Sequence, residues 1–297
     1  PEIKEALAKG LELCNVVKPD LLLATDPDCD RVGIAVPSDN GYELFTGNEV
    51  GAMLLEYICS ERTKMGTMPA DPVAVKTIVT TDIAAKIAKE YGVKLIEVLT
   101  GFKFIGEQIG FLEDKGQEDR YIFGFEESYG YLAGSYVRDK DAVVASMLIC
   151  EMAAFYRTKG ISLIQARENM YKKYGVYVHS QSSFVCEGVT GMERMKEIMS
   201  DLRTNTPKTI GGLTVTRFED YLASTSVDTA TGAKTMLTLP KSDVLTFKLT
   251  DGASVIIRPS GTEPKIKAYY TTTGTTKAEA SALEKTISDD FAKILGF

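Results

Sequence analysis

Three aspartates alternate with other residues in one short loop. Asp26, Asp28 and Asp30 stand at i, i+2 and i+4, directly after an apolar run. Carboxylates this close repel one another unless a cation neutralises them, and hard oxygen ligands suit Mg²⁺ or Ca²⁺ better than zinc. The loop is no EF-hand, because its sixth position holds Arg31 instead of glycine and its twelfth holds Pro37 instead of glutamate. The pattern predicts a site for a hard divalent cation, with a solvated acidic turn as the alternative.

Two adjacent glutamates lie between glycines immediately after another strand-like run, within residues 124–130. Ligands of open α/β sheets bind beyond the carboxyl ends of the strands. Short polar groups on this glutamate loop could therefore hold sugar hydroxyls, although a solvated glutamate pair is equally compatible with the sequence. Downstream, Asp141 could begin a helix, or the same stretch could carry Lys140 to a substrate.

A third loop, residues 258–264, combines a guanidinium with hydroxyls and a glycine. Arg258 can make bidentate hydrogen bonds to an anion, and the backbone N–H groups of Ser260, Gly261 and Thr262 can form an anion-binding nest. Phosphate is the natural ligand for such a set. The segment lacks the G-x-x-x-x-G-K-[ST] pattern of a Walker A loop. A plain turn between two strands is the alternative.

Alternating strands and helices flank these loops. The first predicted elements are a helix over residues 1–13 and strands over 21–24 and 32–36. A helix follows over 48–58, with Asn48 as its N-cap. Strands and helices then alternate over residues 73–79, 82–91, 94–98, 105–113, 121–125 and 141–158. This alternation predicts an α/β layer with a largely parallel sheet.

After residue 175 the pattern changes. Strands are predicted over residues 176–185, 213–218, 244–249, 254–258 and 266–272, and helices over 192–202 and 277–294. Strands bracketed by two helices predict a separate α+β domain. The expected division of the chain is residues 1–44, 45–172 and 173–297, which places the metal loop, the glutamate loop and the Arg258 loop in successive domains.

Composition limits the functions that remain. With 34 basic and 41 acidic residues the net charge is −7, which argues against a broad basic face for nucleic acid. No run of about 18 apolar residues and no leader pattern occurs, so no membrane span is predicted and a cytoplasmic location is expected. Five scattered cysteines without a C-x-x-C pair favour neither a disulfide framework nor a zinc site. The single histidine, His179, lies in a strand-like alternation, so catalysis must depend on carboxylates, lysines or arginines.

In order and spacing, the three loops resemble the metal, sugar and phosphate loops of the α-D-phosphohexomutases, the phosphoglucomutase/phosphomannomutase family. Residues 100–103 resemble a further active-site loop of that family, and residues 124–131 are most similar to those of its bacterial phosphoglucomutases. The resemblance covers essentially the whole chain. Cys29 departs from it, since the family more often has glycine or alanine there.

The resemblance implies a fold of four domains, three of related α/β type and a last α+β domain similar to the TATA-binding protein. This chain would begin inside the second domain. The first domain of the family carries a phosphorylated serine in a Thr-x-Ser-His-Asn-Pro type loop, and no Asn-Pro dipeptide occurs here. The nucleophile is therefore expected on a missing N-terminal domain, and the chain alone is expected to be inactive.

The resemblance also implies an activity, the transfer of a phosphoryl group between C1 and C6 of a hexose phosphate through a bisphosphate. Glucose 1-phosphate to glucose 6-phosphate is the expected reaction. Mg²⁺ would be held by Asp26, Asp28 and Asp30, and sugar hydroxyls by Glu126 and Ser128. The non-reacting phosphate would be bound by Arg258, Ser260, Gly261 and Thr262. Proton-handling or charge-stabilising roles would fall to Arg31, Lys103 and Lys140.

Three other functions remain open. A phosphopentomutase of the same family would use the same loops. A strand followed by Asp-x-Asp also opens the haloacid-dehalogenase phosphatases, in which the first aspartate, here Asp26, is a nucleophile assisted by Mg²⁺; there the motif continues with threonine or valine, and here Asp30 follows. A sugar-phosphate-binding module without catalysis is the third.

Overall fold

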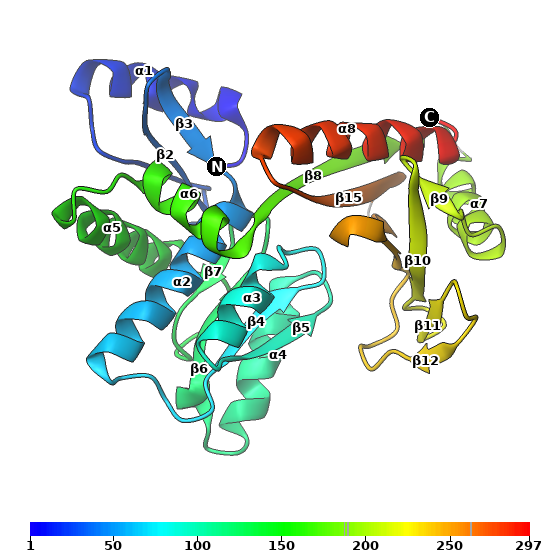
Figure 1. The fold of residues 1–297 in the computed structure, drawn as a ribbon, viewed down its shortest axis with the longest axis horizontal. Helices are drawn as coiled ribbons and strands as arrows, with labels where there is room; N and C mark the ends of the chain where they lie inside the picture. The colour runs from blue at the N-terminus through cyan, green and yellow to red at the C-terminus, as the bar shows by residue number, and fades with distance from the viewer. Residues whose placement is uncertain (187, 189, 262) are drawn as a thin grey trace. The chain divides into compact units, whose positions relative to one another are not determined.

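The computed structural model describes residues 1–297 except 187, 189 and 262 (Figure 1). Contacts divide the chain into two compact units, Pro1–Tyr174 and Gly175–Phe297, and each is described by itself. Mixed α/β structure is found in the first and α+β structure in the second, so the predicted fold class is confirmed. The boundary expected within the first unit, near residue 44, stays a prediction.

The first unit contains two sheets. One is antiparallel, in the order β1-β2-β3, with β1 at Leu22–Thr25, β2 at Val32–Ser38 and β3 at Gly41–Phe45. The other has the order β5-β4-β6-β7, and its strands are β4 Val73–Thr77, β5 Lys94–Val98, β6 Tyr121–Phe125 and β7 Tyr131–Leu132. Strand β4 pairs in parallel with β5 and β6, whereas β7 is antiparallel to β6. The predicted parallel sheet is therefore present, with one short antiparallel edge.

The first unit also contains helices. They are η1 Lys4–Leu7, α1 Ala8–Val17, α2 Gly47–Met65, α3 Ile83–Glu90, α4 Phe102–Glu113, η2 Glu118–Arg120, α5 Ala142–Thr158 and α6 Leu163–Tyr174. Every residue of β4 and β6 is buried, as expected for parallel strands with both faces covered. Phe102, Ile105 and Ile109 of α4 complete a core with Val73 and Val75 of β4.

Helix α2 begins differently from the prediction. Thr46, not Asn48, is the N-cap, and it forms a capping box with Glu49. The Thr46 hydroxyl accepts a hydrogen bond from the Glu49 amide at 3.2 Å, and the Thr46 amide donates to Glu49 Oε2 at 2.9 Å. Both orphan N–H groups are thereby satisfied. Asn48 lies inside the helix, where its Oδ1 accepts from the Thr81 amide at 2.9 Å and ties α2 to the turn after β4.

Two helical glycines offer a matched test of this packing. A Cβ added at Gly51 of α2 would lie 2.0 Å from the Phe125 ring, whereas one at Gly110 of α4 would meet nothing within 4 Å. Gly51→Ala should lower the free energy of unfolding by about 1–3 kcal/mol through overpacking. Gly110→Ala should raise it by about 0.5–1 kcal/mol through lost chain entropy. Urea unfolding of both variants measures the difference, and shifts of the same sign would contradict the packing.

In its described residues the second unit has one antiparallel sheet, two α-helices and one short 3₁₀ helix. Its main sheet runs in the order β12-β11-β10-β13-β14-β15-β8, and β9 pairs with β10. The strands are β8 Val176–Val185, β9 Thr209–Ile210, β10 Leu213–Asp220, β11 Thr225–Asp228, β12 Lys234–Met236, β13 Leu245–Leu249, β14 Ser254–Pro259 and β15 Lys265–Gly274. The short helix η3 spans Thr250–Gly252. Helices α7 (Gly191–Thr204) and α8 (Lys277–Ile294) bury Met199 and Phe291 against this sheet.

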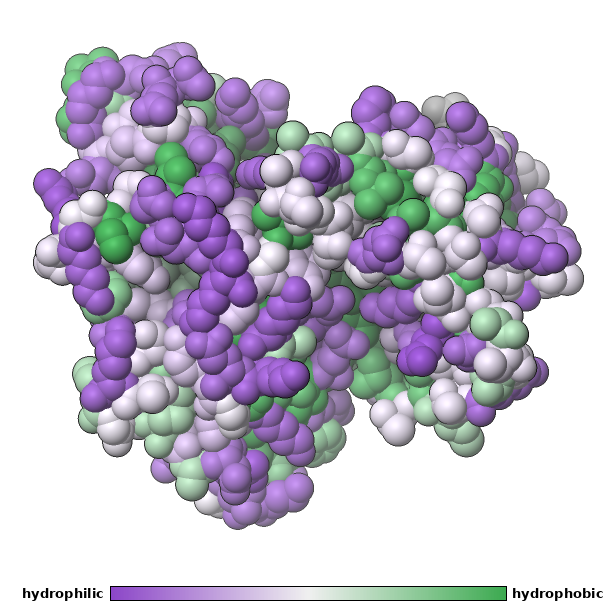
Figure 2. Space-filling view, in the orientation of Figure 1, coloured by the Kyte–Doolittle hydropathy of each residue, from purple (hydrophilic) through white to green (hydrophobic). Residues whose placement is uncertain are grey.

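The surface is mostly polar on the face shown in Figure 2, where hydrophilic residues predominate and hydrophobic ones form small groups. Among the described residues, none of the helices is long and apolar enough to span a membrane. His179 lies in β8, as its strand-like alternation predicts, and its Nδ1 is 3.1 Å from the Thr271 hydroxyl.

Candidate metal and sugar-phosphate site

The metal loop is the tight connection between β1 and β2. The Asp26 carboxylate organises it, because its Oδ1 accepts hydrogen bonds from the amides of Asp30 at 3.1 Å and Arg31 at 3.0 Å. Cys29 has a left-handed backbone, with φ of 58°. Such a conformation is strained for a residue with a Cβ, so a glycine at this position would relieve strain. The thiol of Cys29 is not one of the three converging groups.

The three predicted aspartates converge. One carboxylate oxygen from each of Asp26, Asp28 and Asp30 lies within 4.8 Å of the others. Asp26 is buried, Asp30 half-buried and Asp28 exposed, so the cluster has an open side. Burial would raise the pKa of Asp26, but hydrogen bonds from the Arg31 backbone and side chain outweigh it and hold the pKa well below its usual value. A donor set made only of carboxylate oxygens fits Mg²⁺.

Two of the predicted charged residues lie at this cluster. Arg31 Nε donates to Asp26 Oδ2 at 2.7 Å, and Lys140 Nζ lies 2.5 Å from Asp30 Oδ2. Burial would lower the pKa of Lys140, but Asp30 and the neighbouring Asp139 outweigh it and raise the pKa. Lys140 therefore stays a cation at neutral pH. This places it beside the metal loop as a source of positive charge.

The metal and glutamate loops are joined through the backbone. The Val32 amide donates to the Tyr129 carbonyl at 3.1 Å, and Arg31 forms an antiparallel bridge with Gly130. The start of α5 joins them, because the Ala142 amide donates to the Cys29 carbonyl at 3.2 Å. Three segments far apart in the sequence thus meet at one place in the first unit.

Glu126 connects this place to the residue 100–103 segment. Its carboxyl group is buried, and Oε1 accepts from the Gly101 amide at 2.8 Å. Gly101 is the N-cap of α4 and has φ of 121°, a conformation that favours glycine. Lys103 lies in the first turn of that helix, exposed, with Nζ 4.9 Å from the centre of its neighbour's ring, Phe104. Ser128 is half-buried on the glutamate loop.

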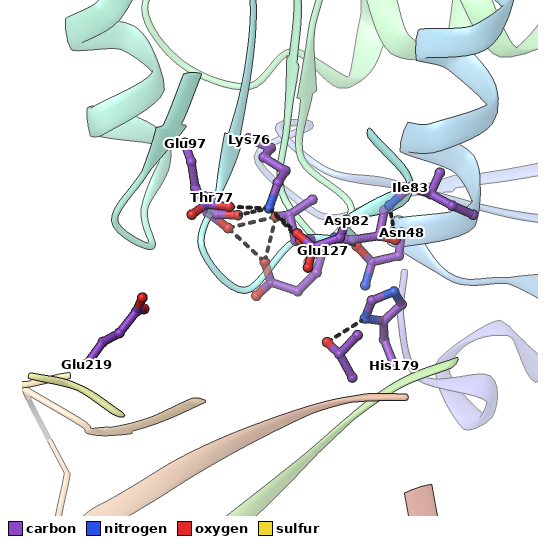
Figure 3. Close-up of polar contacts among 12 residues, drawn as sticks. Asn48, Lys76, Thr77, Asp82, Ile83, Glu97, Glu127, His179 and Glu219 are labelled. Carbon is purple, nitrogen blue, oxygen red and sulfur yellow. Dashed lines mark hydrogen bonds and ion pairs between the residues drawn. The ribbon is translucent and has the colours of Figure 1, made fainter. Parts of the chain in front are cut away.

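A buried lysine lies beneath the glutamate loop and was missed from the sequence. Lys76 of β4 is only 1% exposed, and its Nζ contacts Glu97 Oε2 at 2.5 Å and Asp82 Oδ1 at 3.0 Å (Figure 3). Burial would lower its pKa, but Glu97 and Asp82 outweigh that effect and raise it. The available signal was a lysine inside the otherwise apolar run 73–79, since lysines are almost never fully buried unless paired.

The predicted phosphate loop connects β14 to β15 in the second unit. Pairing continues into the loop, where the Ser260 amide donates to the Lys265 carbonyl at 2.8 Å. This amide is therefore already used, and the prediction that it belongs to an anion-binding nest is wrong in this structure. Arg258 is half-buried, and its buried Nε has no hydrogen-bond partner among the described residues. A buried, unsatisfied N–H of a guanidinium favours an anionic ligand. Thr262, the last predicted phosphate contact, lies outside the described residues.

The start of α5 confirms the helix interpretation of Asp141. This residue is the N-cap, with Oδ1 accepting from the amides of Val143 at 2.8 Å and Val144 at 3.1 Å. Burial would raise its pKa, but the Tyr136 hydroxyl and these amides outweigh it and lower the pKa.

Asp141→Ala should therefore lower the free energy of unfolding by about 1 kcal/mol at neutral pH. Because the folded pKa is depressed, this contribution is present above the unfolded pKa of about 3.9 and is lost as the pH falls toward the folded value. Urea unfolding at pH 7 and pH 3 checks it, with Asp141→Asn as the control that keeps a capping oxygen. An equal loss at both pH values would contradict the charged cap.

Comparison with known proteins agrees with this geometry. Residues 46–174 match the phosphoglucomutase/phosphomannomutase alpha/beta/alpha domain III, and residues 202–289 match the C-terminal domain of the same family. A phosphoglucomutase of Staphylococcus aureus is 38% identical over 270 residues, which are 91% of this chain and 48% of the relative. The chain thus spans about half the length of the curated relatives it matches.

Solved structures show the same fold. The phosphoglucomutase pp63/parafusin from Paramecium, in its open form, superposes with a TM-score of 0.69 at 20% identity, over 97% of this chain and 48% of that one. A putative phosphomannomutase from Thermus thermophilus gives a TM-score of 0.63 at 20% identity, over 100% of this chain and 51% of that one. The chain therefore belongs to the phosphoglucomutase/phosphomannomutase family, the α-D-phosphohexomutases, and corresponds to the C-terminal part of its members.

Proposed function

We propose that this chain supplies the metal, sugar and phosphate loops of a phosphoglucomutase, which moves a phosphoryl group between C1 and C6 of a hexose phosphate. The observation that carries the proposal is the convergence of three aspartates with Arg31, Lys140 and the glutamate loop in one compact unit. A turn that was merely acidic would have no need for this ring of cations and neighbouring polar loops. Catalysis of phosphoryl transfer is largely positioning and charge stabilisation, which such a site provides.

Asp26, Asp28 and Asp30 would hold Mg²⁺, which when bound supplies charge neutralisation for the transferring phosphoryl group. Arg31 keeps Asp26 ionised and fixed, and Lys140 forms an ion pair with Asp30. Both cations add positive charge beside the transferring group. Lys103, exposed at the start of α4, would act from the neighbouring loop.

Glu126 and Ser128 would hold the sugar. Their ligands would be sugar hydroxyls that occupy equivalent places in both orientations of the hexose bisphosphate. The same loop must bind the sugar when phosphoryl transfer occurs at C1 and when it occurs at C6. Arg258, Ser260, Gly261 and Thr262 would bind the phosphate that is not reacting. The unsatisfied Arg258 Nε supports this assignment.

The phosphorylated serine would come from the N-terminal domain of the same polypeptide. The curated relatives leave room for it, because the match covers only 48% of their length. No residue of the three loops replaces such a serine: Ser128 and Ser260 lie on the sugar and phosphate loops. The 297-residue chain alone would then bind ligands without turnover.

The phosphatase alternative is disfavoured. The haloacid-dehalogenase motif continues with threonine or valine, whereas Asp30 stands at that position here. Trapping a phosphoaspartate at Asp26 would revive that alternative.

Substrate choice is tested with the complete polypeptide on glucose 1-phosphate, mannose 1-phosphate and ribose 1-phosphate. The highest kcat/KM is expected for glucose 1-phosphate. A higher value for ribose 1-phosphate would identify a phosphopentomutase, and a higher value for mannose 1-phosphate a phosphomannomutase.

A further inference from the structure

The two glutamates of the loop have separate partners. Glu126 receives the Gly101 amide, as described above. The Glu127 side chain instead lies against the turn that follows β4, where the hydroxyls of Thr77 and Thr80 are both 3.5 Å from its Oε2 (Figure 3). The sugar-binding assignment concerns Glu126 and Ser128 and leaves Glu127 without a role.

The two threonines form a buried pair. Thr77 is 0% and Thr80 3% exposed, and their hydroxyl oxygens are 2.7 Å apart. Each hydroxyl has one proton, so while one donates to its partner the other can donate to Glu127. A buried hydroxyl without an acceptor costs about 1–3 kcal/mol. The Glu127 carboxylate therefore offers an acceptor to this buried pair of hydroxyls.

The turn that carries this pair is itself held rigidly. Lys76 Nζ donates to the carbonyl of Thr80 at 3.0 Å, with the Thr77 carbonyl at 3.4 Å. The Thr81 amide is held by Asn48 of α2. The turn that Glu127 contacts is thus held in place by the buried Lys76 and by Asn48 of helix α2.

The backbone of Glu127 is confined as well. A Cβ added at Gly47, the first residue of α2, would lie 2.1 Å from the Glu127 carbonyl oxygen and 2.7 Å from the Tyr129 amide. The helix therefore contacts the loop backbone directly. Tyr129 continues with a left-handed φ of 68°, which turns the chain back toward Gly130. Between α2 and the threonine pair, the middle of the loop has little freedom.

We propose that Glu127 is a positioning residue. Its contact with the Thr77–Thr80 pair fixes the glutamate loop, so that Glu126 and Ser128 can bind the sugar together. This role rests on the proposed function for its ligand, a hexose phosphate. Glu127 itself does not touch the substrate. Its carboxylate sets the place of both neighbours, and with them the affinity for the sugar.

Hydrogen exchange on the 297-residue chain tests the contact between Glu127 and the Thr77–Thr80 pair, and this measurement does not require mutase activity. The reporter amides are those of Glu126, which donates to the Gly130 carbonyl at 2.9 Å, and Gly101, which donates to Glu126. Glu127→Ala should speed exchange of both amides about tenfold. Glu127→Gln, which keeps an acceptor, should restore most of the protection. Glu107→Ala, an exposed glutamate of α4, is the matched control and should change neither amide.

A second pair of variants changes the threonine hydroxyls that contact Glu127. Thr77→Val with Thr80→Val removes both donors and should speed the same amides, whereas Thr77→Ser with Thr80→Ser should not. Unchanged exchange in both Glu127→Ala and the double valine variant would overturn the proposal.

Turnover of the complete polypeptide gives the functional readout. Loss of a residue that only positions the sugar-binding groups weakens ground-state and transition-state binding alike, so Glu127→Ala should raise KM about three- to tenfold with kcat little changed. A fall in kcat at constant KM would contradict the role of Glu127 as a positioning residue for sugar binding, and would indicate that Glu127 takes part in the chemical step. Absence of mutase activity in the unsubstituted polypeptide would instead contradict the proposed function, and the exchange measurement would still decide the role of Glu127.

Discussion

Replacing Asp28 and Asp30 together by asparagine is expected to weaken Mg²⁺ binding by on the order of a hundredfold or more, because two of three anionic ligands become neutral. In the complete polypeptide, kcat should fall by on the order of a thousandfold, since a metal ion contributes several kcal/mol of charge stabilisation to phosphoryl transfer. Calorimetry with Mg²⁺ measures the first effect and turnover of glucose 1-phosphate the second.

Stability separates this result from simple misfolding. The double substitution relieves repulsion among the three carboxylates but also loses the ion pair of Asp30 with Lys140, so without metal its free energy of unfolding should stay within about 1 kcal/mol of that of the original chain. Only the stabilisation added by Mg²⁺ should disappear. Asp39→Asn is the matched control, because Asp39 is an exposed aspartate just beyond the other end of β2. Equal Mg²⁺ affinity in the double variant and the control would show that the cluster is a solvated acidic turn.

Removing the guanidinium of Arg258 should lower kcat/KM of the complete polypeptide about tenfold to a hundredfold, because hydrogen bonds to charged groups contribute roughly 1.5–3 kcal/mol. Arg258→Lys should recover only part of this loss, since an ammonium cannot reproduce the bidentate fork. Folding should survive the change, because the buried Arg258 Nε has no partner among the described residues that would be left unsatisfied.

Arg217→Ala provides the control for Arg258. Arg217 is an exposed arginine of β10 in the same sheet, and its removal changes the net charge equally. If Arg258→Ala keeps its thermal midpoint and retains the kcat/KM of the Arg217 variant, the loop after β14 is only a turn and the phosphate must bind elsewhere.

Patterns in the sequence located the loops and most of their flanking elements. Strands over 94–98, 121–125 and 176–185 and the final helix over 277–294 were predicted with the bounds that the structure shows. These segments are apolar runs or clear periodic patterns, in which local preference and burial agree. The carboxylate loop was likewise predicted from residue types alone, because three anions in five residues have few stable arrangements without a cation.

Other features depend on contacts that no local pattern reveals. Helix α6 was missed because its inner face buries Arg167, which looks polar in the sequence but pairs with Glu43 at 2.7 Å and Glu49 at 3.3 Å. Lys76 was missed for the same reason, since the carboxylates that make its burial tolerable come from other segments. The bond between Glu126 and Gly101 joins residues 25 positions apart. Tertiary partners, not local propensity, decide such cases.

The most direct test of the account compares the 297-residue chain with the complete polypeptide in a glucose 1-phosphate to glucose 6-phosphate assay with Mg²⁺ and catalytic glucose 1,6-bisphosphate. We expect turnover by the complete polypeptide and none by the purified chain, because the proposed function assigns the metal, sugar and phosphate loops to the chain and the phosphorylated serine to the N-terminal domain. Turnover by the chain alone would show that the nucleophile lies within these 297 residues. A complete polypeptide inactive on every sugar phosphate tested would contradict the mutase assignment itself.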